Sequence, residues 1–165
     1  MNPIRLPAFA DDRWYPSHPL RLQKVIEGYL QPGEARDVFG VMCPHAGYTY
    51  SGHVAGAAYG QINVPDRVIL LGPNHRGGGA PLSIMTRGAW RIPGHDVPID
   101  HHAADVLVRH APELTPDDVA HQGEHSLELQ LPFLVARNPA VSIVPICFYP
   151  LGYDDCVTLG KALAS

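Results

Sequence analysis

The stretch "VILLGPNHRGGG", residues 68 to 79, decides the fold class of this chain. It begins with a short run of apolar residues, a pattern typical of a strand that is buried on both faces in a parallel sheet. The run ends at Gly72, and a turn containing His75 and three glycines follows. Ligands of open α/β sheets bind beyond the carboxyl ends of the strands. We therefore treat His75 as a candidate functional residue.

A similar pattern occurs thirty residues earlier in the chain. Residues 37 to 43, "DVFGVMC", are apolar and rich in β-formers, so we predict a second buried strand there. His45 follows two residues later and would lie with His75 at the same rim of the sheet. Both are candidate metal ligands, because histidine is the commonest metal ligand in proteins. The alternative for His45 alone is a polar turn, in which it caps a helix or bonds to the backbone.

The rest of the chain alternates predicted helices with predicted strands. Helices are expected at residues 17–30, 52–62 and 100–110 and from residue 154, with further strands at 80–86 and 140–149. Asp100 is the expected N-cap of its helix. The pattern predicts one domain over residues 1–165, a three-layer α/β/α fold with a mostly parallel central sheet.

A third motif, "HQGEHSLELQLPFL", covers residues 121 to 134. In its functional interpretation, His125 is an acid–base residue that is oriented by a neighbouring carboxylate such as Glu124. The alternative is the polar start of a helix, opening near Ser126, where a glutamate interacts favourably with the helix dipole.

Composition excludes several classes of protein. The net charge is −4 and 17% of residues are charged, so the chain has no electrostatic footprint for nucleic acid. No apolar run approaches the roughly 18 residues of a membrane span, and the first residues lack a signal-peptide core. Three cysteines without a C-x-x-C pair indicate a reducing cytoplasm. "LLGPNHRGGG" lacks the Lys and Ser/Thr of a phosphate-binding P-loop.

Five segments, in this order, carry a family resemblance over nearly the whole chain: "PHAGYTYSG", "LLGPNHRG", "WRIPGHDVPID", "EHSLELQLPFL" and "VSIVPI". They resemble the Memo-like family, also called AmmeMemoRadiSam system protein B. The family is similar in fold to class III extradiol dioxygenases, which hold Fe(II) with two histidines and a carboxylate. By that resemblance His45 and His75 are metal ligands and His125 is the acid–base residue. Tyr50 and Asn74, inside the first two motifs, are candidate substrate-binding residues.

The resemblance also implies a cofactor and partners. The cofactor is a divalent metal, iron first and copper or zinc as alternatives, in a dioxygenase-like oxidoreductase of unknown substrate. The alternative is a non-catalytic module that binds a small molecule or peptide, with radical-SAM and AMMECR-type proteins as partners. The family continues after "VSIVPI" into a further strand and a Cys-Gly motif that supplies a third ligand. We therefore expect this chain to be the N-terminal portion of the family domain, with an exposed sheet edge and possible homo-oligomerisation.

Overall fold

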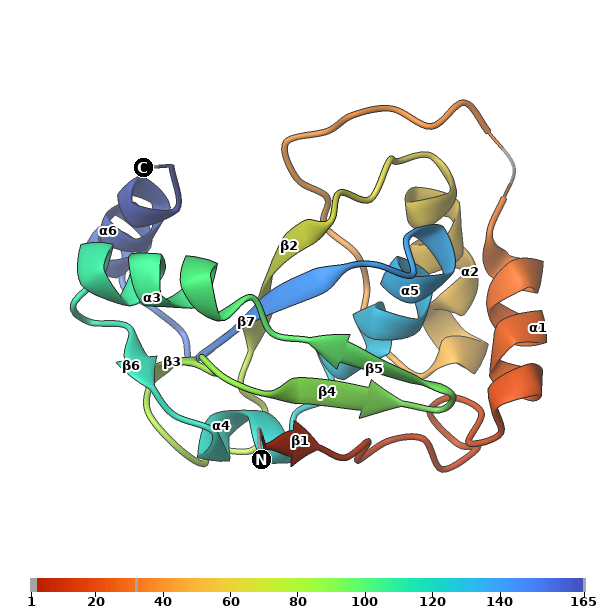
Figure 1. Ribbon diagram of the computed structural model, residues 1–165, viewed down its shortest axis with the longest axis horizontal. Coiled ribbons are helices and arrows are strands. Elements are labelled where there is room, and N and C mark those ends of the chain that lie inside the picture. Colours follow the sequence, from red (N-terminus) through yellow and green to blue (C-terminus); the bar gives the residue numbers. More distant parts are fainter. Residues whose placement is uncertain (1–2, 32, 165) are drawn as a thin grey trace.

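The computed structural model describes residues 3–31 and 33–164 and is built on a four-stranded sheet (Figure 1). In spatial order its strands are β2 (Arg67–Pro73), β7 (Ser142–Phe148), β3 (Leu82–Ile84) and β6 (Thr115–Pro116). β2 runs parallel to β7 and β6 runs parallel to β3, whereas β3 and β7 are antiparallel. The predicted α/β fold is confirmed, with two of these three pairings parallel.

Helices cover both faces of this sheet. One group comprises α1 (Pro19–Tyr29), α2 (Tyr48–Gly60) and α5 (Leu131–Arg137), which follows the 3-10 turn η1 (Glu128–Gln130). The other comprises α3 (His101–His110) and α6 (Tyr153–Ala164), at the opposite side of Figure 1. The short helix α4 (Val119–Gln122) lies below β3 and β6 in that view. None of the helices in the described ranges has both the length and the apolar content needed to cross a bilayer.

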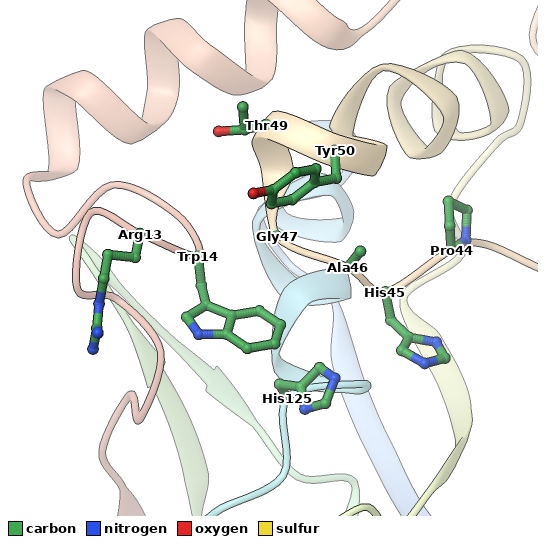
Figure 2. A pocket seen from close by; sticks show the side chains of 9 residues that line it. All are labelled: Arg13, Trp14, Pro44, His45, Ala46, Gly47, Thr49, Tyr50 and His125. Carbon is green, nitrogen blue, oxygen red and sulfur yellow. The ribbon is translucent and has the colours of Figure 1, made fainter.

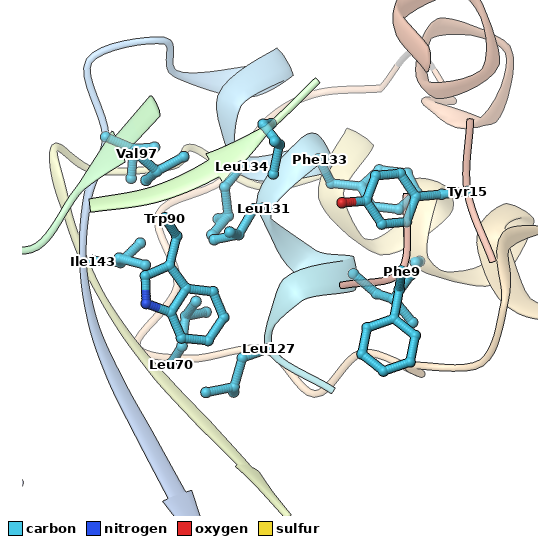
Figure 3. Packing of buried hydrophobic residues seen from close by; sticks show 14 of the residues in the cluster. Phe9, Tyr15, Leu70, Trp90, Val97, Leu127, Leu131, Phe133, Leu134 and Ile143 are labelled. Carbon is cyan, nitrogen blue, oxygen red and sulfur yellow. The ribbon is translucent and has the colours of Figure 1, made fainter. Parts of the chain in front are cut away.

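Strand β7 divides the hydrophobic core into two clusters. Ile143 and Cys147 belong to the larger cluster, packed with α1, α2 and α5 (Figure 3), while Val144 and Ile146 belong to the cluster under α3 and α6. All four are fully buried. A fully buried aliphatic side chain contributes about 1.5–3 kcal/mol. Burial on both faces explains the continuous apolar run that predicted this strand.

A second, three-stranded sheet was not predicted from the sequence. Its order is β1 (Ile4–Arg5), β4 (Ala89–Ile92) and β5 (His95–Pro98), and β4 and β5 form a hairpin. Gly94 turns the chain with φ 86°, a conformation that glycine adopts without steric cost. The available signal was the Pro93-Gly94 pair between residues of alternating polarity. Trp90 and Val97, both fully buried, attach this sheet to the larger cluster.

The starts of α3 and α2 show how individual residues determine where a helix begins and how it packs. Asp100 caps α3 as predicted, because its carboxylate accepts a hydrogen bond from the Ala103 amide at 2.9 Å. α2 begins at Tyr48, four residues earlier than expected. Its close contact with α1 requires glycine at Gly56, where a Cβ atom would lie 2.3 Å from the Tyr29 carbonyl oxygen.

The buried strand predicted at residues 37 to 43 is wrong. This segment has no regular secondary structure, and most of its apolar side chains face solvent, Phe39 being 106% and Met42 97% exposed. Cys43, at its end, is half-buried against the larger cluster. An apolar, β-rich run becomes a buried strand only if neighbouring strands pair with it and a layer covers it. No strand in the described ranges pairs with this segment, and of its apolar side chains only Cys43 packs against the core.

Candidate metal centre

Three histidines from separate segments meet near the end of β2. His45 precedes α2, His75 lies in the turn after β2, and His125 lies between α4 and η1. One ring nitrogen of each lies within 4.8 Å of the others. Ring centroids are 4.4 Å apart for His75 and His125 and 5.2 Å apart for His45 and His75. The two histidines predicted to share a rim therefore lie together, although no strand precedes His45.

The turn that carries His75 is held by its own hydrogen bonds. The Asn74 side chain donates to the Gly78 carbonyl at 2.7 Å and accepts from the amides of Arg76 and Gly77 at 3.0 and 3.1 Å. Gly77 takes a positive φ of 77°, which favours glycine. Asn74, predicted as a substrate-binding residue, is 8% exposed and uses these polar atoms within the turn.

Glu124 fixes the orientation of the His75 ring. This fully buried carboxylate accepts from the His75 amide at 2.6 Å, the Ser126 amide at 2.7 Å and the His75 Nδ1–H at 2.9 Å. Burial alone would raise the pKa of Glu124, but these hydrogen bonds outweigh it and lower the pKa to about 2. Because Nδ1–H of His75 donates its hydrogen bond to the ionised carboxylate, Nε2 is the ring nitrogen available to a metal.

The sequence predicted that Glu124 orients His125, and the structure differs. Nδ1 of His125 lies 3.4 Å from Oε1 of Glu124 but forms no hydrogen bond with it. His75 offers the carboxylate both an amide and a ring N–H, and Ser126 offers a third donor. Glu124 therefore orients His75, which lies 49 positions away along the chain, and not the adjacent His125.

His125 packs against aromatic residues on the side away from His75, and its side chain is 12% exposed. Its ring centroid is 4.6 Å from that of Trp14 and 5.5 Å from that of Phe9. Burial lowers the pKa of His125, and the neighbouring His75 and His45 lower it further, against the opposing effect of Glu124. Burial, followed by His75, also lowers the pKa of His45. Both rings therefore favour the neutral form that binds metals.

The donor set fits a metal ion. Three imidazoles suit iron, copper or zinc. Nδ1 of His125 is buried and has no hydrogen-bond partner among the residues that the structure describes. A buried polar atom without a partner is rare and points to a missing ligand, ion or water. The residues that would hold the ion are His45, His75 and His125.

A second buried carboxylate positions the aromatic wall beside His125. Glu128, fully buried at the start of η1, accepts from the amides of Ala8 and Phe9 at 3.0 and 2.9 Å and from the Tyr15 hydroxyl at 2.8 Å. It also pairs with the buried Arg5. These bonds hold the N-terminal segment against the core, with Phe9 and Trp14 against His125. Sequence reasoning missed this role; its signal was an acidic residue inside the apolar run "LELQLPFL".

A cavity of about 950 Å³ opens beside His45 and His125 (Figure 2). Trp14 and Tyr50 flank it, and Arg13 stands at its rim, ion-paired with Asp11 at 2.7 Å. Tyr50, the other residue predicted to bind substrate, is 78% exposed and lines this cavity. A cavity of this size accommodates a small organic molecule.

The α/β fold and the histidine cluster beside this cavity define a class of protein with a candidate mononuclear metal site. Within that class, the chain belongs to the Memo-like protein family, whose model matches residues 5–165. A MEMO1 family protein of Methanopyrus kandleri is 40% identical over 96% of this chain and 61% of its own length. One of Methanothermobacter thermautotrophicus is 35% identical over 98% and 63%, respectively. The chain spans about three fifths of the length of these curated relatives.

Proposed function

We propose that this chain binds one divalent metal ion through His45, His75 and His125 and supports metal-dependent oxidation of a small organic substrate. The observation that carries the proposal is the convergence of three imidazole nitrogens within 4.8 Å of one another. The buried, unpartnered Nδ1 of His125 supports it. Iron is the favoured ion because the sequence motifs resemble the Memo-like family. That family is similar in fold to class III extradiol dioxygenases, which hold Fe(II).

The residues around such an ion would have different roles. When bound, the ion would supply a Lewis acid with open positions for substrate and oxygen. Glu124 holds His75 in the tautomer that presents Nε2. Trp14 and Phe9 pack on His125 and exclude water from one side of its ring. Tyr50, on the open side of the cavity, contacts the bound substrate.

Oxygen uptake tests the enzymatic part of the proposal. The chain is loaded with Fe(II) without oxygen, and oxygen consumption is then followed with a panel of catechols. We expect iron-dependent uptake that is lost in His45→Ala and kept in the control His53→Ala, a histidine on the exposed side of α2. Iron binding without oxygen uptake across the panel would contradict the enzymatic part of the proposal.

The proposal makes His125 the third ligand, the alternative from its sequence motif is a proton acceptor, and one variant separates the two roles. His125→Ala should lose bound iron if the ring is a ligand. If the ring instead moves a proton, the variant should keep iron and lose turnover. Metal content is measured on the same protein sample as oxygen uptake, so that each loss is assigned to its cause.

The open cavity, with Trp14 and Tyr50 in its wall, favours a second candidate, a module that binds a peptide or small molecule for partner proteins. Radical-SAM and AMMECR-type proteins are the partners that the sequence motifs suggest. Pull-down of either protein by a chain that shows no turnover would support this candidate over the enzyme. The variant Tyr50→Ala should weaken such an interaction if the cavity carries it.

A further inference from the structure

Gln130, at the end of η1, has a buried side-chain amide that is hydrogen-bonded at both its nitrogen and its oxygen. Nε2 donates to the Ser126 carbonyl at 3.2 Å and to the Pro44 carbonyl at 3.3 Å. Oε1 accepts from the Tyr59 hydroxyl at 3.1 Å. The residue is 7% exposed. A buried polar group whose bonds are satisfied in this way makes the segments that it joins rigid.

The two carbonyls that accept from Gln130 belong to segments that carry histidines of the candidate metal centre. Pro44 directly precedes His45, and its carbonyl lies in the same planar peptide group as the His45 nitrogen. Ser126 directly follows His125. One side chain therefore joins the segment before α2 to the segment before η1.

Ser126 extends the network to the segment of the third histidine. Its hydroxyl donates to the Pro73 carbonyl at 3.1 Å, two residues before His75. Ser126 is buried, so water competes little for this bond. Gln130 and Ser126 thus connect all three ligand-bearing segments, although neither side chain belongs to the histidine cluster itself.

Tyr59 sets the direction of the Gln130 amide. A carbonyl oxygen can only accept, so Nε2 faces the two carbonyls and Oε1 faces the hydroxyl. The buried Tyr59 ring is itself fixed, because it stacks on Phe133 with centroids 5.3 Å apart and an interplanar angle of 3°. The amide therefore has one orientation in which all of its bonds form.

His45 depends on this network more than the other two histidines do. After His45 the chain is fixed by the Tyr48 amide, which donates to the Trp14 carbonyl at 2.8 Å. Before it, residues 38 to 43 form no backbone–backbone hydrogen bond with any residue in the described ranges. The bond from Gln130 to Pro44, with the packing of Cys43, therefore fixes the chain on that side.

We propose that Gln130 is a positioning residue of the candidate metal centre, which holds His45 in place beside His75 and His125. Its effect on metal affinity rests on the metal binding proposed above, whereas its effect on the position of His45 does not. A ligand that is held in place before the ion arrives binds the ion more tightly, because less ordering accompanies binding.

Two measurements on Gln130→Met test this proposal. Methionine is close to glutamine in length and carries no N–H donor. Nuclear Overhauser contacts between the histidine rings are recorded in the metal-free chain, and Zn²⁺ affinity is measured by calorimetric titration. The control Gln61→Met changes an exposed glutamine at the end of α2.

We expect Gln130→Met to lose the contacts from His45 to His75 and His125. The contact between His75 and His125, whose ring centroids are 4.4 Å apart, should remain. Zn²⁺ affinity should fall about tenfold, the lower end of the range for a residue that supports a metal ligand. The control should match the wild type in both measurements.

Three results would overturn the proposal. They are persistence of the His45 contacts in Gln130→Met, wild-type Zn²⁺ affinity in that variant, and loss of the His75–His125 contact as well, which would make Gln130 a residue of general folding. Tyr59→Phe keeps the ring stack and removes only the orienting hydroxyl. It should weaken the same His45 contacts, and full-strength contacts there would also count against the proposal.

Failure of metal binding is a separate outcome. If the wild type takes up no Zn²⁺, the metal binding proposed above is contradicted. The ring contacts of the metal-free chain then still decide whether Gln130 positions His45.

Discussion

The segments that carry the three histidines differ in how firmly hydrogen bonds and packing fix them. On the side of His75 and His125, buried carboxylates accept hydrogen bonds from backbone amides and side chains at 2.6–3.0 Å. On the side of His45, residues 38 to 42 are exposed, Cys43 packs against the larger cluster, and the Pro44 carbonyl accepts one hydrogen bond, from the Gln130 side chain at 3.3 Å. One half of the candidate site is therefore pre-organised. The other half contributes its ligand from a segment with little local support, so ordering that segment should limit metal affinity.

Removing Glu128 should have the largest effect, because it holds the pre-organised side together. Glu128→Ala leaves Arg5 buried without its partner and releases the Phe9 amide and the Tyr15 hydroxyl. Breaking a buried ion pair in this way costs about 3–5 kcal/mol. We expect urea unfolding to report a loss of that size, and the exposed control Glu113→Ala to stay within about 0.5 kcal/mol of wild type. A loss below 1 kcal/mol in Glu128→Ala would contradict the role assigned to it.

The pH dependence of stability should report a second buried group on the same side. His121 is fully buried, and burial, reinforced by Arg5, lowers its pKa to about 4 against the opposing effects of Asp117 and Glu124. The unfolded chain therefore binds more protons below pH 6.5, so the free energy of unfolding should fall between pH 6.5 and pH 4. The fall attributable to His121 is on the order of 3 kcal/mol.

The comparison of wild type with His121→Phe, in metal-free protein, isolates that contribution. His45 and His125, whose pKa values are also lowered, add to the slope in both proteins. The variant should show a shallower loss of stability between pH 6.5 and pH 4. Equal slopes in the two proteins would mean that His121 is not buried in its neutral form.

Glu124 tests pre-organisation at the site itself. Loss of a hydrogen-bond partner behind a metal-bound histidine typically lowers metal affinity about 10–100-fold. We expect a loss in that range for Glu124→Ala and a smaller one for Glu124→Gln, since the amide oxygen can still accept from one donor. Calorimetric titration with Zn²⁺ measures both. Equal affinities in the three proteins would show that the His75 ring needs no orienting partner.

The smallest effect is expected on the unsupported side. Phe39→Ser and Met42→Ser replace side chains that are already in solvent, so the free energy of unfolding of the 165-residue chain should change by no more than about 0.5 kcal/mol. Chemical denaturation checks this. A loss above 2 kcal/mol would indicate that the segment is buried, as its sequence pattern predicted, and would remove the contrast between the two sides.

The sequence predicts the covered parts of the fold and fails where tertiary context decides. β2, β7 and the Asp100 cap follow from apolar runs and a local hydrogen bond. Residues 37 to 43 carry the same kind of apolar run, but a run does not specify its partner strand, and the described chain supplies none.

The site shows the same division. The three histidines could be picked out because each lies in a polar turn beside an apolar run. The bond from Glu124 to His75 could not, because it joins residues 49 positions apart that no local pattern relates. The same holds for Glu128, whose partners lie more than 110 residues away in a segment that sequence reasoning left irregular.

Metal titration of single histidine variants tests the central claim most directly. Fe(II), under anaerobic conditions, and Zn²⁺ are titrated into the wild type, His45→Ala, His75→Ala, His125→Ala and the exposed control His53→Ala. The account predicts one ion per chain in the wild type and in the control. It predicts a loss of affinity in His45→Ala and His75→Ala greater than the about 10–100-fold expected from losing Glu124. Unchanged uptake of both metals in His45→Ala and His75→Ala would contradict it.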